Sequence, residues 1–321
     1  MEILYRTLYL LIMKTSILVG GQAVIEGVMM RVPGAYATAI RLKNGEIISK
    51  RYNFKSTIEN NKLQNYILIR GIIHLYESMK IGYQTLSWSA SVFEEENTSK
   101  KKKISLVNNI LESIANVFSI VLAASLFILL PLFLTGYIVQ DINKPIYFNI
   151  VSGIIRISIF LLYLILISQL KDVKRLFQYH GAEHKTVYNF ESGRALCSNE
   201  AQKFSTKHPR CGTSFMFIIM LVTIFSYTIL DSFVLLFIDE LTIFIRFFLH
   251  IACLPIVAGI GYEVLKFLAS KQKILFFNYL SKPGLWLQNI TTKTPDTEQI
   301  DVAIYALKKA FGKNLKLYSG K

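Results

Sequence analysis

The stretch SIANVFSIVLAASLFILLPLFLTGYIVQ, residues 113–140, decides the fold class of this chain. It runs for 28 residues without a charged side chain, and most of its residues are apolar. About 20 predominantly apolar residues in a helix are enough to cross the hydrocarbon core of a bilayer. The stretch therefore predicts a transmembrane helix and a membrane protein built around it.

Three further apolar runs follow, at residues 145–170, 211–230 and 242–268. The middle run has no charge, and the titratable side chains of the other two are Arg156 in the first and Arg246, His250, Glu263 and Lys266 in the last. Ionisable groups inside a span are costly and usually face a partner or a cavity. We expect an α-helical membrane domain of four transmembrane helices over residues 113–268, with the buried basic residues paired inside the bundle.

The formal charge of +15 is distributed unevenly along the chain. Of the 36 lysines and arginines, 15 precede residue 113, eight lie in residues 171–210 and ten lie in residues 264–321. Because cytoplasmic loops carry an excess of basic residues, we expect both termini and the 171–210 loop to be cytosolic. Their charge attracts anionic lipid first, and a protein or ribonucleoprotein partner second. The three cysteines include no C-x-x-C pair, so we expect no structural disulfide on this reducing side.

The expected parts of the chain are a cytosolic N-terminal α+β domain at 14–98, a charged linker at 99–112, the spans at 113–268 with a cytosolic histidine-rich loop at 171–212, and a cytosolic amphipathic tail at 269–321. The first part has a glycine turn, a hairpin over Tyr36–Ser49 and an amphipathic helix over Lys62–Phe93. Asn44-Gly45 in the hairpin favours a type I′ turn. The tail ends in a helix over Ile300–Phe311, which we expect to dock on a partner.

Three of the five histidines lie in the polar segment between the second and third spans. His180, Glu183 and His184 form the pattern H-x-x-E-H, and on a helix all three share one face. This is the inverted form of the zincin motif, in which two imidazoles bind a metal and the carboxylate acts as a base. His208 and Cys211 add two candidate ligands directly before the third span. The glycine after His180 weakens the helix prediction, because glycine costs about 1 kcal/mol in a helix interior.

Three interpretations of this cluster are open. In the first, His180, His184 and a third ligand hold a catalytic divalent metal, with zinc favoured, and Glu183 accepts a proton from the activated water. In the second, the three histidines and the cysteine close a tetrahedral structural site. In the third, the same side chains form a hydrogen-bonded cluster without metal. The candidates for the third ligand are His208, which we favour, and then Glu191, Cys211 and Glu263.

The glycine pair at residues 20–21 also has two interpretations. It has neither the Gly-Lys-Ser/Thr of a P-loop nor a G-x-G-x-x-G pattern, so a phosphate-binding loop is not supported. We favour a strand that ends in a tight turn formed by these glycines, and we expect this turn to pack closely on a neighbour. In the alternative, Glu26 or Arg31 from the same segment contributes to the site.

Five motifs resemble those of the YqhQ-like bacterial membrane proteins: GGQAVIEGVMMR at 20–31, RG at 70–71, HGAEHK at 180–185, HPRCGTSF at 208–215 and PGLWLQ at 283–288. The resemblance extends from about Ser16 to the final helix. This family is a domain of unknown function that is often labelled a predicted metal-dependent enzyme. The label implies a metal at His180, His184 and His208 and names no substrate. The chain departs from the family in the residues before Met13 and in its richness in lysine and asparagine.

Together these observations predict an inner-membrane protein with a metal-dependent hydrolase site at the cytosolic face, acting on a peptide bond or a lipid-linked substrate. The alternative is a non-enzymatic, membrane-anchored assembly or biogenesis factor that docks a partner such as a ribosome or translocon. A transporter is a third hypothesis, suggested by Arg156, Arg246 and His250. Four spans without an inverted repeat argue against it unless the chain forms a homo-oligomer.

Overall fold

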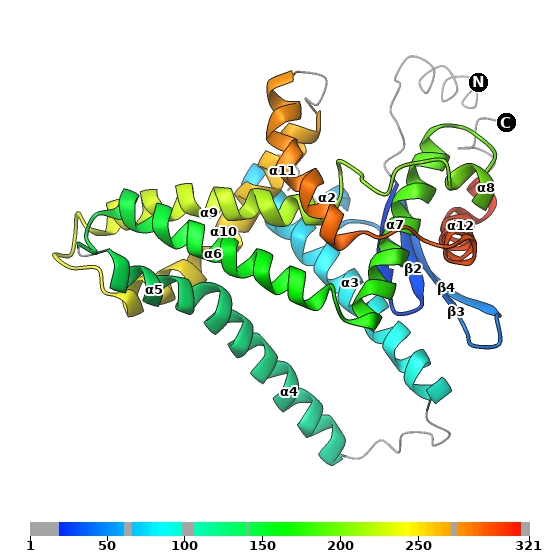
Figure 1. Cartoon of the computed structure of the whole chain (residues 1–321), viewed down its shortest axis with the longest axis horizontal. Coiled ribbons are helices and arrows are strands. Elements are labelled where there is room, and N and C mark those ends of the chain that lie inside the picture. Colours follow the sequence, from blue (N-terminus) through cyan, green and yellow to red (C-terminus); the bar gives the residue numbers. More distant parts are fainter. Residues whose placement is uncertain (1–18, 61–65, 98–105, 140, 271–274, 316–321) are drawn as a thin grey trace.

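The computed structural model describes residues 19–60, 66–97, 106–139, 141–270 and 275–315. Long apolar helices form a bundle, and a four-stranded sheet covered by helices lies at one end of it (Figure 1). The remaining residues lie outside the described structure, and with them much of the predicted linker at 99–112.

Within the described residues, four helices are long and apolar enough to cross a membrane, as predicted, and they cover Ser113–Ile138, Pro145–Ile167, Gly212–Val234 and Ile243–Leu268. The first consists of two α-helices joined by a π-helical turn, η2. The elements of the bundle are α4 (Leu106–Ala124), η2 (Ser125–Leu129), α5 (Leu130–Ile138), α6 (Pro145–Ile167), α9 (Gly212–Val234) and α10 (Ile243–Ser270). Many of their large apolar side chains are exposed, which is compatible with contact to lipid.

Polar side chains pair inside the bundle. Asp231 of α9 accepts hydrogen bonds from Arg246 Nη1 of α10 at 2.6 Å and from Asn149 Nδ2 of α6 at 2.7 Å. His250 Nε2 lies 3.0 Å from the other carboxylate oxygen of Asp231, and all of these side chains are buried. Arg156 has a different partner, because its Nε donates to the Phe127 carbonyl in the π-helical turn at 3.1 Å. The cluster therefore ties α6, α9 and α10 together.

The sheet is an antiparallel meander in the order β1 (Gly20–Val24), β2 (Gly27–Val32), β3 (Ala35–Arg41) and β4 (Ile47–Asn53). The predicted hairpin is present as β3 and β4, but its turn is not type I′. That turn requires a positive φ at both central residues, and of the two only Gly45 has one, at +86°. Asn44 instead uses its side chain to accept a hydrogen bond from the Glu46 N–H at 2.9 Å. One left-handed residue is enough to close this loop.

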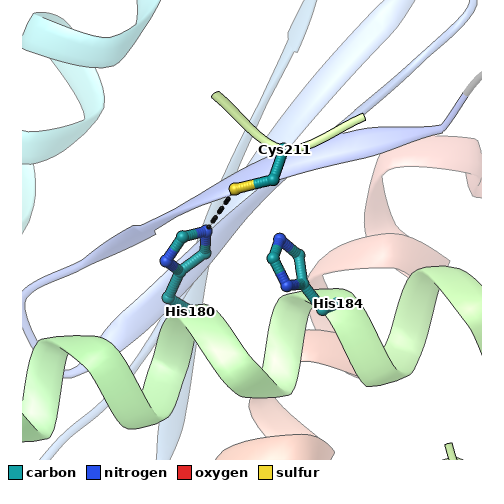
Figure 2. A group of neighbouring side chains, drawn as sticks. All are labelled: His180, His184 and Cys211. Atoms are coloured by element: carbon teal, nitrogen blue, oxygen red, sulfur yellow. Dashed lines mark hydrogen bonds between the residues drawn. The ribbon is translucent and has the colours of Figure 1, made fainter. Parts of the chain in front are cut away.

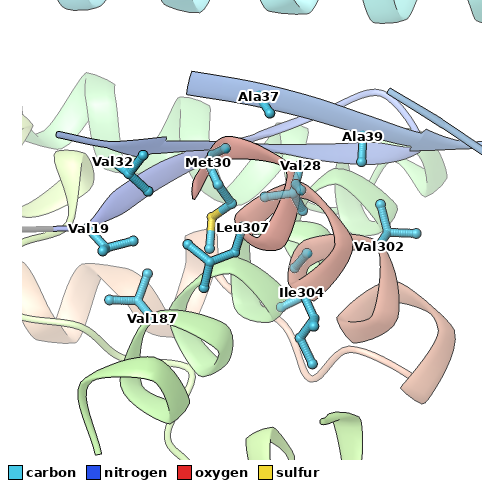
Figure 3. Close-up of a cluster of buried hydrophobic side chains, with 14 of the residues drawn as sticks. Val19, Val28, Met30, Val32, Ala37, Ala39, Val187, Val302, Ile304 and Leu307 are labelled. Atoms are coloured by element: carbon cyan, nitrogen blue, oxygen red, sulfur yellow. The ribbon is translucent and has the colours of Figure 1, made fainter. Parts of the chain in front are cut away.

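Helices from the middle and the end of the chain cover one face of the sheet. They are α7 (Lys171–Glu191), which follows α6, and α12 (Thr297–Phe311). Val28, Met30 and Val32, alternate residues of β2, point into a core shared with Val187 of α7 and Leu307 of α12 (Figure 3). The core of the sheet is therefore completed by segments far apart in sequence.

The C-terminal helix does not present its apolar side to a partner. Asp296 and Gln299 form the capping box at the start of α12, and the apolar residues that follow are buried. The apolar side that we expected to dock on a partner is therefore buried against the sheet of the same chain.

The other face of the sheet contacts α3 (Ile67–Asn97), the predicted amphipathic helix. Ile81 of α3 packs with Met29 and Tyr36 of the sheet. Nearer its start, α3 lies against α10, where a Cβ at Gly71 would be 2.6 Å from the Gly259 carbonyl oxygen. The remaining elements are α2 (Thr57–Asn60), α8 (Ser198–Ala201), α11 (Leu275–Thr291) and η3 (Gly312–Asn314).

Candidate metal centre

Helix α7 carries the H-x-x-E-H pattern as one continuous helix. His180, Glu183 and His184 therefore share one side of it, as expected. Gly181 allows this helix to approach the segment before α12. A Cβ at Gly181 would lie 2.1 Å from the Lys293 carbonyl oxygen, and the Lys293 N–H donates to the Phe177 carbonyl at 2.9 Å. The glycine is needed for the close approach of two backbones.

Backbone carbonyls orient both imidazole rings. His180 Nδ1 lies 2.9 Å from the carbonyl oxygen of Thr291, at the end of α11, and His184 Nδ1 bonds to the carbonyl of Thr206. Because a carbonyl only accepts, both Nδ1 atoms carry a proton, and each neutral ring keeps a lone pair on Nε2. Metal-binding histidines are typically held by such a bond from the other ring nitrogen.

Cys211 brings a sulfur atom to the two free ring nitrogens. It is the N-cap residue of α9, and its Sγ accepts a hydrogen bond from the Thr213 N–H at 3.4 Å. Sγ lies 3.2 Å from His180 Nε2, and the ligand atoms of His180, His184 and Cys211 all lie within 4.8 Å of one another (Figure 2). Two imidazoles and a cysteine sulfur are a donor set that fits zinc.

Glu183 is buried beside these three side chains, with 5 % of its surface exposed. Its carboxylate lies 3.5 Å from His184 Nε2 and accepts a hydrogen bond from the Gly21 N–H. Burial raises the pKa of Glu183, and the opposing effects of His180, His208 and the Gly21 N–H do not cancel the rise. A carboxylate whose pKa is raised holds a proton more readily, which suits a general base.

A cavity of about 120 Å³ connects these groups. Its walls include the motif side chains of α7, Cys211, Arg210 and the backbone of Gly20 and Gly21 in β1. Only a glycine fits at position 21, because a Cβ there would lie 2.9 Å from Glu183 Cγ and 2.3 Å from the Met29 carbonyl oxygen. The glycine pair is thus not the turn at the end of a strand that we expected, because both residues lie at the start of β1. The expected close packing is present, and the neighbour is the central carboxylate of the site.

His208, favoured as the third ligand, lies beside the cluster. Its ring centroid is 5.6 Å from that of His184, and its Nε2 is 3.8 Å from the carboxylate of Glu191. Its backbone is fixed by the Gln288 side chain, which accepts from the His208 N–H at 2.8 Å and donates to the His208 carbonyl at 2.9 Å. The ligand atom of Cys211 lies with those of His180 and His184, and His208 is not part of this group.

Glu191 is also next to the centre without belonging to the cluster. It forms an ion pair with Arg210 as well as its contact to His208. Burial would raise the pKa of Glu191, but His208 and Arg210 lower it below its ordinary value. Glu191 is therefore an anion that contacts His208 and Arg210, two residues of the cavity wall.

The other candidate residues lie elsewhere. Glu26 forms an ion pair with Arg175 of α7 and accepts a hydrogen bond from Tyr179 at 3.3 Å. Arg31 lies 4.5 Å over the ring of Phe54, on the opposite side of β2 from Met30. Glu263 of α10 binds Arg70 of α3 through two hydrogen bonds, at 2.9 and 2.5 Å, so it does not approach the histidines.

Sequence reasoning missed the groups that orient the site. The carbonyls of Thr206 and Thr291 contribute no side chain, so no residue pattern marks them. Gln288 and Gly21 had a signal, since both lie in the short motifs that carried the family resemblance. Their roles become visible only when α11 and β1 are placed beside α7.

Comparison with known proteins yields one family and one relative. The model of the family "Protein of unknown function (DUF1385)" matches residues 67–313. The chain is 33 % identical over 297 residues to "Uncharacterized protein YqhQ" of Bacillus subtilis (strain 168), and the match covers 89 % of each protein. No solved structure matches the chain. The chain belongs to the YqhQ-like family of proteins of unknown function, DUF1385.

Proposed function

We propose that this protein is a metal-dependent hydrolase that acts at the cytosolic face of the bacterial inner membrane. The observation that carries the proposal is the convergence of His180 Nε2, His184 Nε2 and Cys211 Sγ beside the buried carboxylate of Glu183. A divalent metal, with zinc favoured, is the cofactor that this donor set suits. When bound, such an ion polarises a substrate carbonyl and lowers the pKa of a water molecule to about 7.

The residues of the chain have distinct roles in this proposal. Glu183 accepts a proton from the attacking water and returns it to the leaving group. The Gly21 N–H holds the Glu183 carboxylate in place. Arg210 lines the cavity and supports the negative charge that develops on the substrate oxygen.

The orientation of His208 supports a catalytic site over a closed structural one. A closed site needs four protein ligands, whereas a catalytic zinc site keeps one position open. His208 is the remaining histidine nearby, and its ring faces Glu191. The fourth position is therefore left for water or substrate.

The charge distribution supports the proposed orientation in the membrane. The segment 171–210 carries eight basic residues and lies at the same end of the bundle as the sheet. The loop between α5 and α6, at the other end, has a single lysine, Lys144. By the positive-inside rule, the end with the candidate centre is cytosolic.

Elemental analysis of the protein purified in detergent tests the proposal first. We expect about one zinc, iron or manganese ion per chain in the wild type, and its loss in His184→Ala. Glu183→Gln should retain the ion but lose roughly 10²–10⁴-fold in hydrolysis of a metalloprotease substrate such as casein. Glu200→Gln, in a partly exposed carboxylate that pairs with Lys203, is the matched control and should change neither property. Absence of metal from all variants, even after reconstitution, would refute the proposal.

A docking function for an assembly or biogenesis factor is a second candidate. It is favoured by exposed apolar side chains on α3, outside the four long apolar helices, among them Tyr76, Met79 and Tyr83. Co-purification with ribosomes at low salt that is lost in Tyr83→Asp and kept in Glu183→Gln would support it. Ribosome binding that persists in both variants, or no ribosome binding in the wild type, would count against it.

A further inference from the structure

Strand β1 has an unpaired edge, and the register of the sheet shows which backbone groups lie on it. Among the strands of the described residues, β1 pairs with β2 only. The Arg41 N–H donates to the Glu26 carbonyl, so every second residue from Glu26 onward bonds to β3, and the residues between them bond to β1. Counted through the β1–β2 register, this leaves Gly21 and Ala23 with their N–H and C=O groups pointing away from the sheet.

The outward edge of β1 faces the candidate metal centre. The Gly21 N–H donates to Glu183, as its outward direction requires. The N–H and C=O of one residue point to the same side of an antiparallel strand, so the Gly21 carbonyl also points outward. Gly20 and Gly21 line the cavity together with His180 and His184, and strands of the sheet pass behind the two rings in Figure 2.

The Glu183 side chain lies against the Gly21 N–H, but Gly20 and Gly21 add no side chains of their own to this part of the edge. Gly20 and Gly21 are exposed, and a Cβ at Gly20 would have no atom within 4 Å. A glycine inside a strand often marks a place where another backbone approaches closely. The cavity, about 120 Å³, is smaller than the roughly 300–1,000 Å³ of typical small-molecule pockets. It therefore has room for one reacting group, and the rest of a substrate must lie along the strand.

We propose that the substrate is an extended polypeptide segment that adds to β1 as a further strand, an inference that rests on the hydrolase function proposed above. Main-chain hydrogen bonds provide the affinity in this mode of recognition. An N–H of the segment donates to the Gly21 carbonyl, and the adjacent peptide bond lies beside Glu183. Water adds its oxygen to the peptide carbonyl carbon, the C–N bond breaks, and the proton held by Glu183 goes to the leaving amine. The step needs no other reactant.

Peptide binding to the inactive Glu183→Gln protein tests the proposal without depending on turnover. The probes are a fluorescein-labelled library of random decapeptides and the same library with every second amide N-methylated, measured by fluorescence anisotropy. N-methylation removes the donors that strand addition needs, so we expect at least about tenfold weaker binding of the methylated library. Equal binding of both libraries would overturn the proposal.

A pair of substitutions locates the binding edge. Ala23→Pro removes an outward N–H from β1 and places the proline ring at its edge, while the hydrogen bonds to β2 are kept. We expect it to weaken binding of the unmethylated library at least about tenfold. Ser49→Pro, whose N–H points outward from the opposite edge strand β4, is the matched control and should bind as before. Unchanged binding in Ala23→Pro, with metal content and thermal stability preserved, would refute docking at β1.

Two further outcomes separate this inference from the function on which it rests. If the peptide library does not bind while dioctanoyl phosphatidic acid does, the site takes a lipid-linked substrate and strand addition is wrong. If the library binds with the expected pattern but the metal-loaded wild type does not cleave it, strand addition holds and the hydrolase function fails.

Discussion

At the scale of single residues, Gly181 shows how a local preference is overruled. In an isolated helix, replacing glycine by alanine would stabilise the protein by about 1 kcal/mol. Here the new Cβ would meet the Lys293 carbonyl oxygen at 2.1 Å. We expect Gly181→Ala to destabilise the protein by about 1–3 kcal/mol, as overpacking does, and to disturb His180. Thermal unfolding in detergent measures the change, with Gly212→Ala as the control because its Cβ would meet no atom within 4 Å. A higher melting temperature for Gly181→Ala would contradict the packing argument.

Asp231 is the residue on which the polar cluster of the bundle depends. Arg246 is fully buried, and Asp231 is the carboxylate that pairs with it. Asp231→Asn would leave a buried guanidinium without its counter-charge, which typically costs about 3–5 kcal/mol. We expect a marked loss of thermal stability, whereas Asp141→Asn, in an exposed pair with Lys144, should have little effect. Equal stability of the two variants would show that the buried pair is not needed.

At the scale of elements, Glu77 links α3 to the segment that follows the sheet. Its carboxylate accepts hydrogen bonds from the Ser56 hydroxyl and the Thr57 N–H, each at 2.8 Å. Burial would raise the pKa of Glu77, but these bonds lower it below its ordinary value. A lowered pKa means that the ionised form stabilises the fold above about pH 4.3, and that this contribution is lost as the pH falls through the folded-state pKa.

The acid sensitivity of the fold should therefore decrease when Glu77 cannot ionise. We expect Glu77→Gln to be less stable than the wild type at pH 7, and the difference to shrink as the pH falls below 4. Melting temperatures of the two proteins between pH 3 and pH 7 provide the measurement. Glu95→Gln, farther along the same helix, is the control and should follow the wild type. Parallel curves for Glu77→Gln and the wild type would exclude this role.

Elements differ in how much of them can be predicted from sequence. The four long apolar helices can be predicted from uninterrupted runs of apolar residues, and the shared side of His180, Glu183 and His184 on α7 from their spacing along the chain. Both signals are local, because the residues that carry them are close together in sequence. The choice of Cys211 over His208 cannot be predicted in this way, because it depends on Gln288 and Glu191, which fix the backbone and ring of His208 from other elements. The covering of the sheet by α12 was missed for a related reason. An amphipathic pattern shows that a helix has an apolar face but not which surface that face meets.

At the scale of the whole molecule, chemical labelling of the native cysteines tests the proposed orientation of the protein in the membrane. Cys197 is exposed, Cys211 is buried and Cys253 is partly buried in a long apolar helix. We expect a membrane-impermeant maleimide to label Cys197 in inside-out vesicles and not in intact spheroplasts. Asp239→Cys, in the loop at the other end of the bundle, should give the opposite result in a Cys197→Ser background. Labelling of Cys197 from the outside would reverse the orientation and place the centre outside the cytosol.

The covering of β2 by α12 has a consequence for how the protein is made. Val28, Met30 and Val32 leave the ribosome long before α12, with all four long apolar helices in between. At a synthesis rate of roughly 5–20 residues per second, the apolar face of the meander waits for on the order of tens of seconds. Thr291, whose carbonyl orients His180, arrives just as late. The metal that we propose for this site would therefore be loaded last in the biogenesis of the chain, after membrane insertion is complete.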